Sequence, residues 1–440
     1  MCLRIVLTSE TFSRTITVDL VTLIQNKEFL MKHLVSSLCA TFLFSTVVLA
    51  QEPDWNQFRG SKRDNHSFST GIAKSWSEGG PKLLWKIDTL GNGYSNLCFV
   101  GDRIFTMSDF GDRTFVVALN RADGKEVWRQ DIGRGAGRDY PGPRCTPASD
   151  GEMVYAVGRY GEIAALNAKD GKVVWSKSIP DDFGGRYMGS WGFAMSPLLD
   201  GERIVIPTGS EGGTLIAFDK TGKILWRTTT LPDMAAYTSV VPVEIEGVRQ
   251  YLLLTGKSLV GLSPTDGKIL WGANFPGDVP AICSDPVLCG DVIMASGSYG
   301  VGAYFYRISK EGDNFKAFDF HGADTELQSH HGGIVAVKDH FYLLTNDQMA
   351  CVEAKTGKVV WKNRSVGKGS LTYVDGVLIL RKEKDEGTIA MIEATPEGYK
   401  ELGRFDQPDR SSLNSWTYPL VVDKKLYIRD QNVLLVYDLN

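Results

Sequence analysis

The sequence lacks several features that would indicate common functional classes. No Cys-x-x-Cys pair and no adjacent cysteines occur, so a metal site built on paired cysteines is not predicted. No block of like charges occurs either, and the formal net charge is only −4, so a nucleic-acid-binding surface is not expected. Kinase, protease and nuclease motifs are also missing. With 43% hydrophobic and 23% charged residues, the composition is that of an ordinary globular protein.

Long apolar runs are scarce, and the single one lies near the N-terminus. Residues 34–49 are apolar or small and follow Lys32, and they lead to a cleavage-like site at Ala50. Met31 is a natural start for such a peptide. We therefore predict that residues 1–50 comprise an upstream extension and a signal peptide that starts at Met31 and is cleaved after Ala50. The mature chain is then periplasmic or extracellular, and the run is too short to predict a transmembrane span.

Cysteine is sparse, and its pattern does not suggest a disulfide framework. A lipid anchor at Cys39 fits poorly, because Leu38 stands where a small residue is required. Removing residues 1–50 leaves an odd number of cysteines, so at least one thiol is free or pairs between molecules. We expect small buried side chains, with a Cys283–Cys289 bridge as an open alternative. The cysteines of the predicted mature chain are Cys98, Cys145, Cys283, Cys289 and Cys351.

What the sequence does contain is a repeated unit. Each copy is an apolar strand, a turn with Gly-Lys, and a second strand that ends in tryptophan. Glycine in such turns suits β-hairpins, because it accepts positive φ without steric cost. The turns lack the alternating oxygen ligands of a calcium loop. The clear copies are residues 118–128, 165–175, 217–226, 261–271 and 352–361, and degenerate copies are residues 304–318 and 389–405.

A second type of hairpin alternates with this unit, and the chain ends complement each other. Residues 81–89 read as a fourth strand with nothing before it, and residues 433–439 read as a third strand without a fourth. Residues 81–440 span 360 residues, or eight repeats of 45. We predict an all-β fold: an eight-bladed β-propeller of four-stranded antiparallel blades, closed by pairing of strands 81–89 and 433–439. The second hairpins are residues 95–107, 146–157, 196–206, 240–254, 284–295, 332–344, 371–380 and 418–428.

Residues 51–80 precede the closing strand and are predicted to form an N-terminal arm. Its motif DWNQFRG, residues 54–60, is expected to pack near the closure with Trp55 and Phe58 buried and Arg59 paired with a carboxylate or carbonyl. A cofactor role for the motif is the alternative. Tryptophans that recur at one blade position are expected to pack between sheets as structural residues. They are Trp85, Trp128, Trp175, Trp226, Trp271 and Trp361.

The repeat, with clear copies at 163–175 and 349–361, resembles the PQQ-like repeat. This repeat is the blade unit of pyrroloquinoline-quinone dehydrogenases and of BamB-type propellers. Further similarity lies in WGFAMSP (191–197), in YTS (237–239) and in DWNQFRG with Arg63 and LLW at 83–85. The resemblance covers residues 54–440 and implies a secreted bacterial propeller. BamB-type proteins are scaffolds in outer-membrane β-barrel assembly, which implies a protein or peptide partner, for example one added as a strand to a hairpin edge.

The dehydrogenases of this fold imply a different chemistry. They use an aromatic floor for the quinone, an Asp base, and a carboxylate and an amide that hold Ca²⁺, and the alcohol dehydrogenases add a ring of two adjacent cysteines. Adjacent cysteines do not occur here, and no residue of the sequence can be assigned to the calcium or base role by motif. Fold alone does not carry function.

A binding site is predicted on the loops that lead into the first strand of each blade, at residues 133–145, 180–196, 320–333 and 406–418. These loops combine arginine with aromatic residues, the composition of a recognition surface. The alternative that these side chains plug the channel and tie blades together stays open. The candidate binding residues are Arg138, Arg144, Arg186, Tyr187, Trp191, His330, His331 and Trp416.

His330 and His331 also raise a metal hypothesis. Adjacent side chains in an extended chain point to opposite sides, so both should not reach one ion. His321 lies nine residues before His330, but no cysteine or paired carboxylate completes a metal-ligand spacing. We expect no metal, and one of the two histidines to face the channel as a hydrogen-bonding group.

Three functions follow from the sequence. The leading hypothesis is a secreted, non-catalytic, monomeric scaffold for a protein or peptide, with no cofactor and no nucleic acid. The first alternative is a quinoprotein oxidoreductase that uses pyrroloquinoline quinone and calcium. The second is a propeller that binds a small molecule or carbohydrate through Trp191 and Trp416.

Overall fold

The computed structural model describes residues 4–5, 16–17, 54–135, 139–210 and 213–440. Strands β1 (Arg4–Ile5) and β2 (Ile16–Thr17) pair antiparallel within a separate unit, Met1–Gln51. The predicted signal peptide and its cleavage site lie outside the described residues. In the described parts of the chain, no helix has the length and apolar character needed to cross a membrane.

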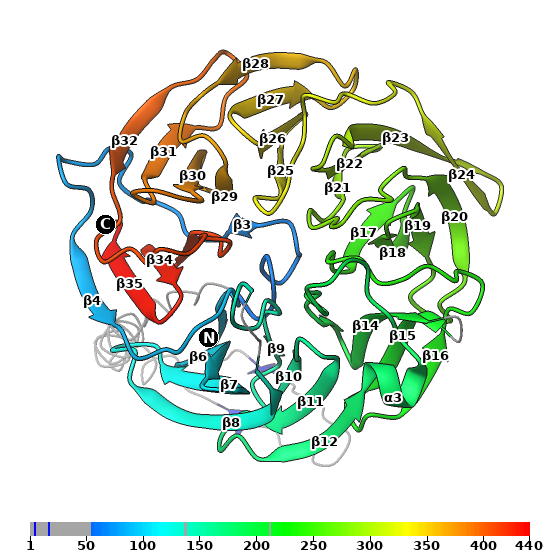
Figure 1. Ribbon diagram of the computed structural model, residues 1–440, viewed down its shortest axis with the longest axis horizontal. Helices are drawn as coiled ribbons and strands as arrows, with labels where there is room; N and C mark the ends of the chain where they lie inside the picture. The colour runs from blue at the N-terminus through cyan, green and yellow to red at the C-terminus, as the bar shows by residue number, and fades with distance from the viewer. Residues whose placement is uncertain (1–3, 6–15, 18–53, 136–138, 211–212) are drawn as a thin grey trace. The chain divides into compact units, whose positions relative to one another are not determined.

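The second unit, Glu52–Asn440, is a ring of eight antiparallel blades whose first strands lie innermost and whose fourth strands form the rim (Figure 1). Blade 1 contains β5 (Cys98–Val100), β6 (Arg103–Phe110), β7 (Arg113–Asn120) and β8 (Glu126–Arg134). Blade 2 contains β9 (Ala148–Ser149), β10 (Met153–Val157), β11 (Glu162–Asn167) and β12 (Val173–Ser178), and the short helix α3 (Ile179–Phe183) follows. Blade 3 contains β13 (Leu198–Asp200), β14 (Arg203–Ser210), β15 (Gly213–Asp219) and β16 (Ile224–Arg227).

The ring continues in chain order. Blade 4 contains β17 (Val241–Ile245), β18 (Val248–Leu254), β19 (Ser258–Leu262) and β20 (Ile269–Asn274). Blade 5 contains β21 (Val287–Cys289), β22 (Val292–Gly297), β23 (Gly302–Glu311) and β24 (Asn314–Asp319). Blade 6 contains β25 (Ile334–Val337), β26 (His340–Leu344), β27 (Met349–Glu353) and β28 (Val359–Asn363). Blade 7 contains β29 (Gly369–Val374), β30 (Val377–Lys382), β31 (Ile389–Glu393) and β32 (Glu401–Phe405).

Blade 8 closes the ring with both ends of the propeller. It contains β33 (Leu420–Val422), β34 (Lys425–Asp430), β35 (Val433–Asp438) and, as its outer strand, β4 (Leu83–Ile87). Strands β35 and β4 pair antiparallel, with Leu434 opposite Ile87 and Val436 opposite Trp85. The predicted eight blades and their closure by the terminal strands are therefore confirmed. This closure leaves no open edge between the first and last blades.

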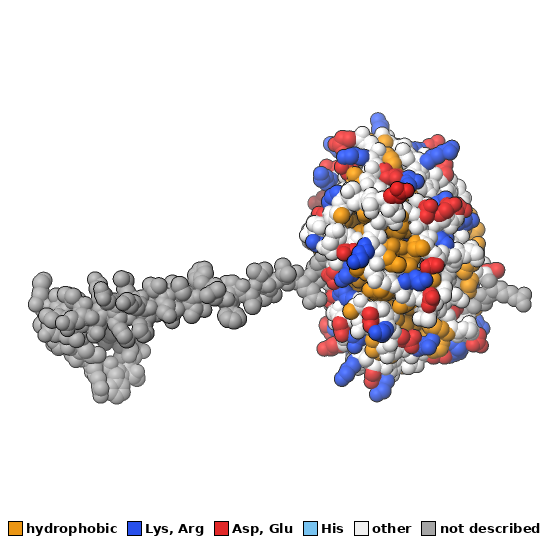
Figure 2. Space-filling view, turned by 90° about the vertical axis from the view of Figure 1, so that its left-hand side faces the viewer, with side chains coloured by type: hydrophobic (Ala, Val, Ile, Leu, Met, Phe, Trp, Pro, Cys, Tyr) orange, Lys and Arg blue, Asp and Glu red, His pale blue; other side chains and the backbone are white. Residues whose placement is uncertain are grey.

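Burial falls from the channel to the rim. The second strand of blade 7, β30, buries five of its six residues, whereas the outer strand β12 buries none. Figure 2 views the rim from the side of β4 and β32 and shows hydrophobic side chains at its centre, with both signs of charge interspersed around them. Leu83 and Leu84 of β4 are among the exposed hydrophobic side chains.

The recurring tryptophans lie on outer strands and contact the next blade. A Cβ on Gly171 would lie 2.6 Å from the Trp128 ring, and the glycine has a φ of +74°. The Gly-Lys turn therefore needs glycine for its backbone conformation and for the neighbouring indole. Trp271 instead donates to Gln250 within its own blade. The indole N–H groups that donate to a carbonyl of the following blade are those of Trp128 to Ala168, Trp175 to Lys220, Trp226 to Pro264 and Trp361 to Thr395.

The segment after Asp54 enters the central channel (Figure 1). Trp55 is buried in the core of blades 1 and 8, at the closure, and Phe58 packs edge-to-face on Tyr418 at 5.7 Å. The segment then returns along blade 7, where β3 (His66–Ser67) pairs parallel with β29. It is thus a loop whose two limbs run along the inner strands, and we call residues 54–67 the channel plug.

The channel plug bonds to the first strand of every blade, or to the residues that lead into it. Arg63 donates to the carbonyls of Ser196, Pro197 and Val240, which belong to blades 3 and 4. Arg59 donates to the Ile334 carbonyl of blade 6 at 2.5 Å and lies 3.9 Å from the Asp285 carboxylate of blade 5. Further bonds join Trp55 to Phe99, Asn56 to Ser149, Gln57 to Leu199, Asn65 to Leu371 and Ser67 to Val421.

Candidate functional site

A cavity of about 270 Å³ lies at the mouth of the channel, above the plug. Because the strands of each blade alternate in direction, the loops between blades and the turns between second and third strands share one face of the ring. Loops before all eight blades contribute side chains to the cavity, and Phe58 of the plug lines it too. We call this side the loop face. The cavity is therefore a pocket closed from beneath rather than a through-channel.

The structure brings five of the eight candidate binding residues to this cavity: Arg144, Trp191, His330, His331 and Trp416. Tyr187 is not among the lining residues, and its ring packs on that of Phe193 at 5.0 Å. Arg186 is exposed, and its backbone N–H donates to the Gly209 carbonyl. Arg138 lies outside the described residues.

One wall of the cavity is a group of aromatic rings around Trp416. The ring centroids of Tyr94 and Tyr140 lie 4.3 and 5.0 Å from the Trp416 ring. The Arg144 guanidinium lies 5.5 Å from the Tyr94 ring and 5.7 Å from Trp416, within cation–π range. Burial lowers the pKa of Arg144 to about 10, so the side chain remains charged at neutral pH. The wall thus offers flat apolar area beside a fixed positive charge.

The two adjacent histidines lie next to this aromatic group and contact it. Their ring centroids are 3.7 Å apart, so the expectation that the two imidazoles point to opposite sides is wrong. The reason is that this segment is not an extended strand: the chain bends at His331, before β25 begins. His331 also stacks on Trp416 at 4.3 Å and 19°. One ring nitrogen of each histidine and the Cys283 sulfur all lie within 4.8 Å of one another.

The histidines are neutral, and a lysine holds one of them. Burial, with a smaller contribution from the Lys368 charge, lowers the pKa of His330 to about 3. Burial and the neighbouring His330, Lys368 and Arg144 lower the pKa of His331 well below its ordinary value. The Lys368 ammonium lies 2.9 Å from His330 Nδ1 and 3.2 Å from the Glu383 carboxylate.

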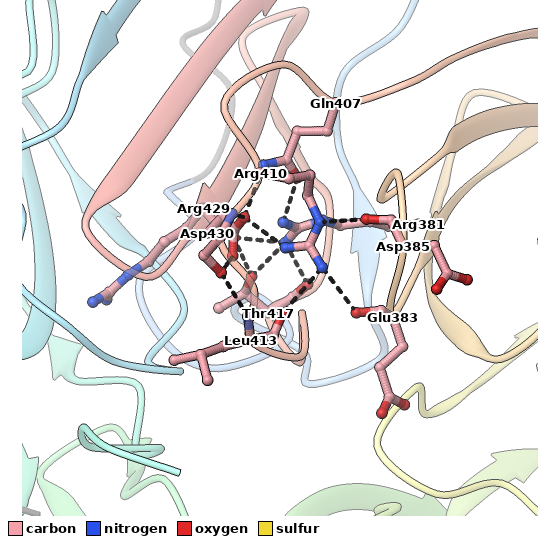
Figure 3. A network of polar contacts seen from close by, with 10 residues as sticks. Arg381, Glu383, Asp385, Gln407, Arg410, Leu413, Thr417, Arg429 and Asp430 are labelled. Atoms are coloured by element: carbon pink, nitrogen blue, oxygen red, sulfur yellow. Dashed lines mark hydrogen bonds and ion pairs between the residues drawn. The ribbon is translucent and has the colours of Figure 1, made fainter.

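A buried polar network holds the loop that carries Trp416 in place (Figure 3). Arg410 donates to the Asp430 carboxylate at 2.5 Å and to the Glu383 carbonyl at 3.2 Å. Arg381 donates to Thr417 Oγ1 at 2.7 Å. Burial favours the neutral form of Asp430, but Arg381, the Ser411 amide and Arg410 outweigh it and hold its pKa below the ordinary value. The network thereby fixes the loop that carries Trp416.

The cysteines are free thiols throughout the described chain, so the open alternative of a Cys283–Cys289 bridge is wrong. Cys283 lines the cavity, and burial raises its pKa to about 12. Cys289 lies on β21, and its thiol donates to the Lys338 carbonyl. Their surroundings differ because Cys283 precedes the first strand of blade 5, whereas Cys289 ends it.

Sequence reasoning missed several lining residues. Tyr140 stands in a predicted loop between two selected arginines, and its position could have suggested it. Lys368 comes from a short connection between blades, and Glu383 from the turn after β30, so neither carries a signal of composition or spacing. Tyr94 follows the closing strand and was likewise not selected.

The ring of eight blades is a PQQ-like propeller, as a comparison with protein families shows. The sequence profile of the family described as outer membrane protein assembly factor BamB matches residues 112–314 and 316–397. The chain therefore belongs to that family. Among curated proteins, no sequence relative of the chain is found.

Solved structures share the fold at low identity. BamB from Moraxella catarrhalis is 14% identical with a TM-score of 0.56, over 81% of this chain and 99% of that one. A quinohemoprotein alcohol dehydrogenase from Pseudomonas putida is 14% identical with a TM-score of 0.62, over 88% and 80%. A europium-containing methanol dehydrogenase is 13% identical with a TM-score of 0.61, over 86% and 89%. At such identities, the likeness concerns the fold alone.

The donors of the cavity do not fit a calcium-bound quinone. Ca²⁺ takes about 6–8 oxygen ligands, several of them carboxylates. Among the described lining residues, Glu383 is the one carboxylate, and it is paired with Lys368. Three lining side chains, Arg144, Lys368 and Lys384, are cationic, which further disfavours a divalent hard cation.

Proposed function

We propose that the chain is a secreted, non-catalytic binding propeller that holds a segment of a protein partner in the loop-face cavity. One observation carries this proposal: a pocket that the plug closes from beneath is lined by both Arg144 and the aromatic rings around Trp416. Tyrosine, tryptophan and arginine are the side chains that dominate protein recognition. The family and the structure of BamB are consistent with a protein partner.

The dimensions and charge of the cavity define the expected segment. Its volume of about 270 Å³ is just below the ~300–1,000 Å³ of typical small-molecule sites. It therefore suits one or two side chains of a peptide better than a larger organic ligand. Three cationic groups against one carboxylate favour an acidic segment with an aromatic or aliphatic residue.

A selection from random peptides displayed on phage tests this proposal. The purified protein should enrich acidic peptides with an apolar residue, and synthetic copies should bind it in calorimetry. Arg144→Ala should weaken their binding by about 30-fold, the effect of losing an interface hot spot. Arg249→Ala is the matched control, because this exposed arginine lies next to the turn between β17 and β18, on the opposite face. Peptides that bind wild type and Arg144→Ala equally would refute the proposal.

The quinoprotein alternative is supported by the fold neighbours and is tested separately. Titration with pyrroloquinoline quinone, with and without Ca²⁺, should give no calcium-dependent heat or spectral change, because the donor set does not suit calcium. Saturable, calcium-dependent binding would restore that alternative. The carbohydrate alternative predicts that sugars change the tryptophan fluorescence.

A further inference from the structure

Cys283, His330 and His331 come together in the cavity, and the proposed peptide site does not use them. The two loops that carry them precede blades 5 and 6, which are neighbours in the ring. All three residues line the cavity and are partly exposed to it. An ion from solvent can therefore reach them.

The geometry is close to that of a bound metal ion. The three donor atoms lie within 4.8 Å of one another. Three ligand atoms about 2.0–2.3 Å from a shared ion lie ~3.3–4.0 Å apart in trigonal or tetrahedral geometry, so side-chain movements of about 1 Å bring the donors into range. His330 Nε2 and His331 Nδ1 are buried and have no hydrogen-bond partner among the described residues.

Donor chemistry selects the class of metal. Neutral imidazole and thiolate are ligands for soft or borderline transition metals, and not for calcium or magnesium. We propose that Cys283, His330 and His331 form a binding site for a soft transition-metal ion, with Cu(I) preferred over Zn(II). The metal site uses side chains other than Arg144 and Trp416, although His331 stacks on Trp416, and it does not require peptide binding.

Charge decides between the two metals. Cu(I) with one thiolate and two neutral imidazoles is a neutral group. Zn(II) with the same ligands keeps a positive charge beside Lys368 and near Arg144. The nearest carboxylate, Glu383, lies 4.0 Å from His331 Nδ1 but already pairs with Lys368. Binding releases the thiol proton of Cys283 to solvent as the sulfur–metal bond forms, so affinity should rise with pH.

Lys368 competes with the metal through His330. Its ammonium donates to Nδ1 of the ring, which places the ring proton on Nε2. A metal that binds Nδ1 must displace Lys368, and a metal that binds Nε2 must displace that proton. Removing the lysine should therefore tighten metal binding, which a merely structural role of Lys368 would not do.

The test is an anaerobic titration of the purified protein with Cu(I) against a chromogenic chelator. We expect one tight equivalent. Cys283→Ser should weaken binding by at least about 100-fold, the upper end of the effect of changing a supporting residue. Cys351→Ser is the matched control, because this buried thiol lies on β27, outside the cavity. Lys368→Met should tighten binding by about tenfold, because the metal no longer has to displace one hydrogen bond of the lysine to His330 Nδ1.

His330→Asn provides a second ligand variant if Cys283→Ser does not fold, as judged by its fluorescence and circular dichroism. Unchanged Cu(I) affinity in folded Cys283→Ser or His330→Asn overturns the site. Weaker binding by Lys368→Met overturns the competition argument, and tighter binding of Zn(II) than of Cu(I) overturns the charge argument. Loss of Cu(I) binding with peptide binding intact would support the independence of the two activities.

Discussion

Replacing Arg63 by methionine should lower the free energy of unfolding by about 3–5 kcal/mol. The Arg63 side chain is 1% exposed, and its guanidinium donates to the carbonyls of Ser196, Pro197 and Val240. Each buried carbonyl that loses its donor costs about 1–3 kcal/mol. Methionine recovers part of this by apolar contact, so the net loss falls in the range of about 3–5 kcal/mol for breaking a buried ionic group.

Urea unfolding followed by tryptophan fluorescence measures this loss. The control is Arg249→Met, whose side chain is 56% exposed and pairs with Asp200 at the surface. Such a pair contributes less than about 1 kcal/mol. If both variants unfold at the same urea concentration with the same slope, the plug does not hold blades 3 and 4 together through Arg63.

Two further changes test other parts of the ring. Gly222→Ala places a Cβ 2.8 Å from the Trp175 ring, whereas Gly247→Ala has a similar positive φ but places its Cβ in open space. In urea unfolding, Gly222→Ala should therefore lower the free energy of unfolding by about 1–3 kcal/mol more than Gly247→Ala does. Equal losses of stability would mean that the indole moves aside at no cost. Asp430→Asn should cost about 3 kcal/mol at pH 7, because it breaks a buried pair with Arg410. The Asp430 pKa is lowered on folding, so its stabilisation is lost as pH falls below the unfolded value of about 3.9, and the difference from wild type should shrink at pH 3. A difference that stays constant between pH 7 and pH 3 would contradict the charge assignment; the exposed Asp409→Asn is the control.

The fold could be predicted because its determinants are local and repeated. The Gly-Lys turn requires glycine twice, for a positive φ and for the indole of the preceding blade, as at Gly171 and Trp128. These requirements recur at a nearly regular spacing, so the strand count and the pairing of β4 with β35 follow from the sequence. The conformation of each turn depends only on its own few residues and on one tryptophan of the preceding blade.

The candidate site could be predicted only in part, because its geometry is not local. Composition marks loops rich in arginine and aromatic residues, which is why Arg144 and Trp416 could be selected. Lys368 and Glu383 lie in short connections without such a signal, and they reach the cavity only through the curvature of the ring. The histidine argument assumed an extended chain, but the backbone bends at His331.

The path of the plug was also beyond sequence reasoning. Its arginines pair mostly with backbone carbonyls, which every residue possesses, so no sequence pattern indicates which carbonyl is chosen. The burial of Trp55 near the closure could be predicted, because an apolar side chain next to the closing strand is expected to join its core. Contacts of Arg63 with blades 3 and 4 depend on the width of the channel.

The two ends of the channel plug lie on the same face of the ring. The Asp54 carboxylate accepts from the Gly101 amide, in the turn between β5 and β6, and the outgoing limb reaches Asp375, in the turn between β29 and β30. Both turns lie on the face opposite the cavity. A fluorescent label attached at Asp54 therefore lies on the back of the ring and leaves the cavity free for its ligand.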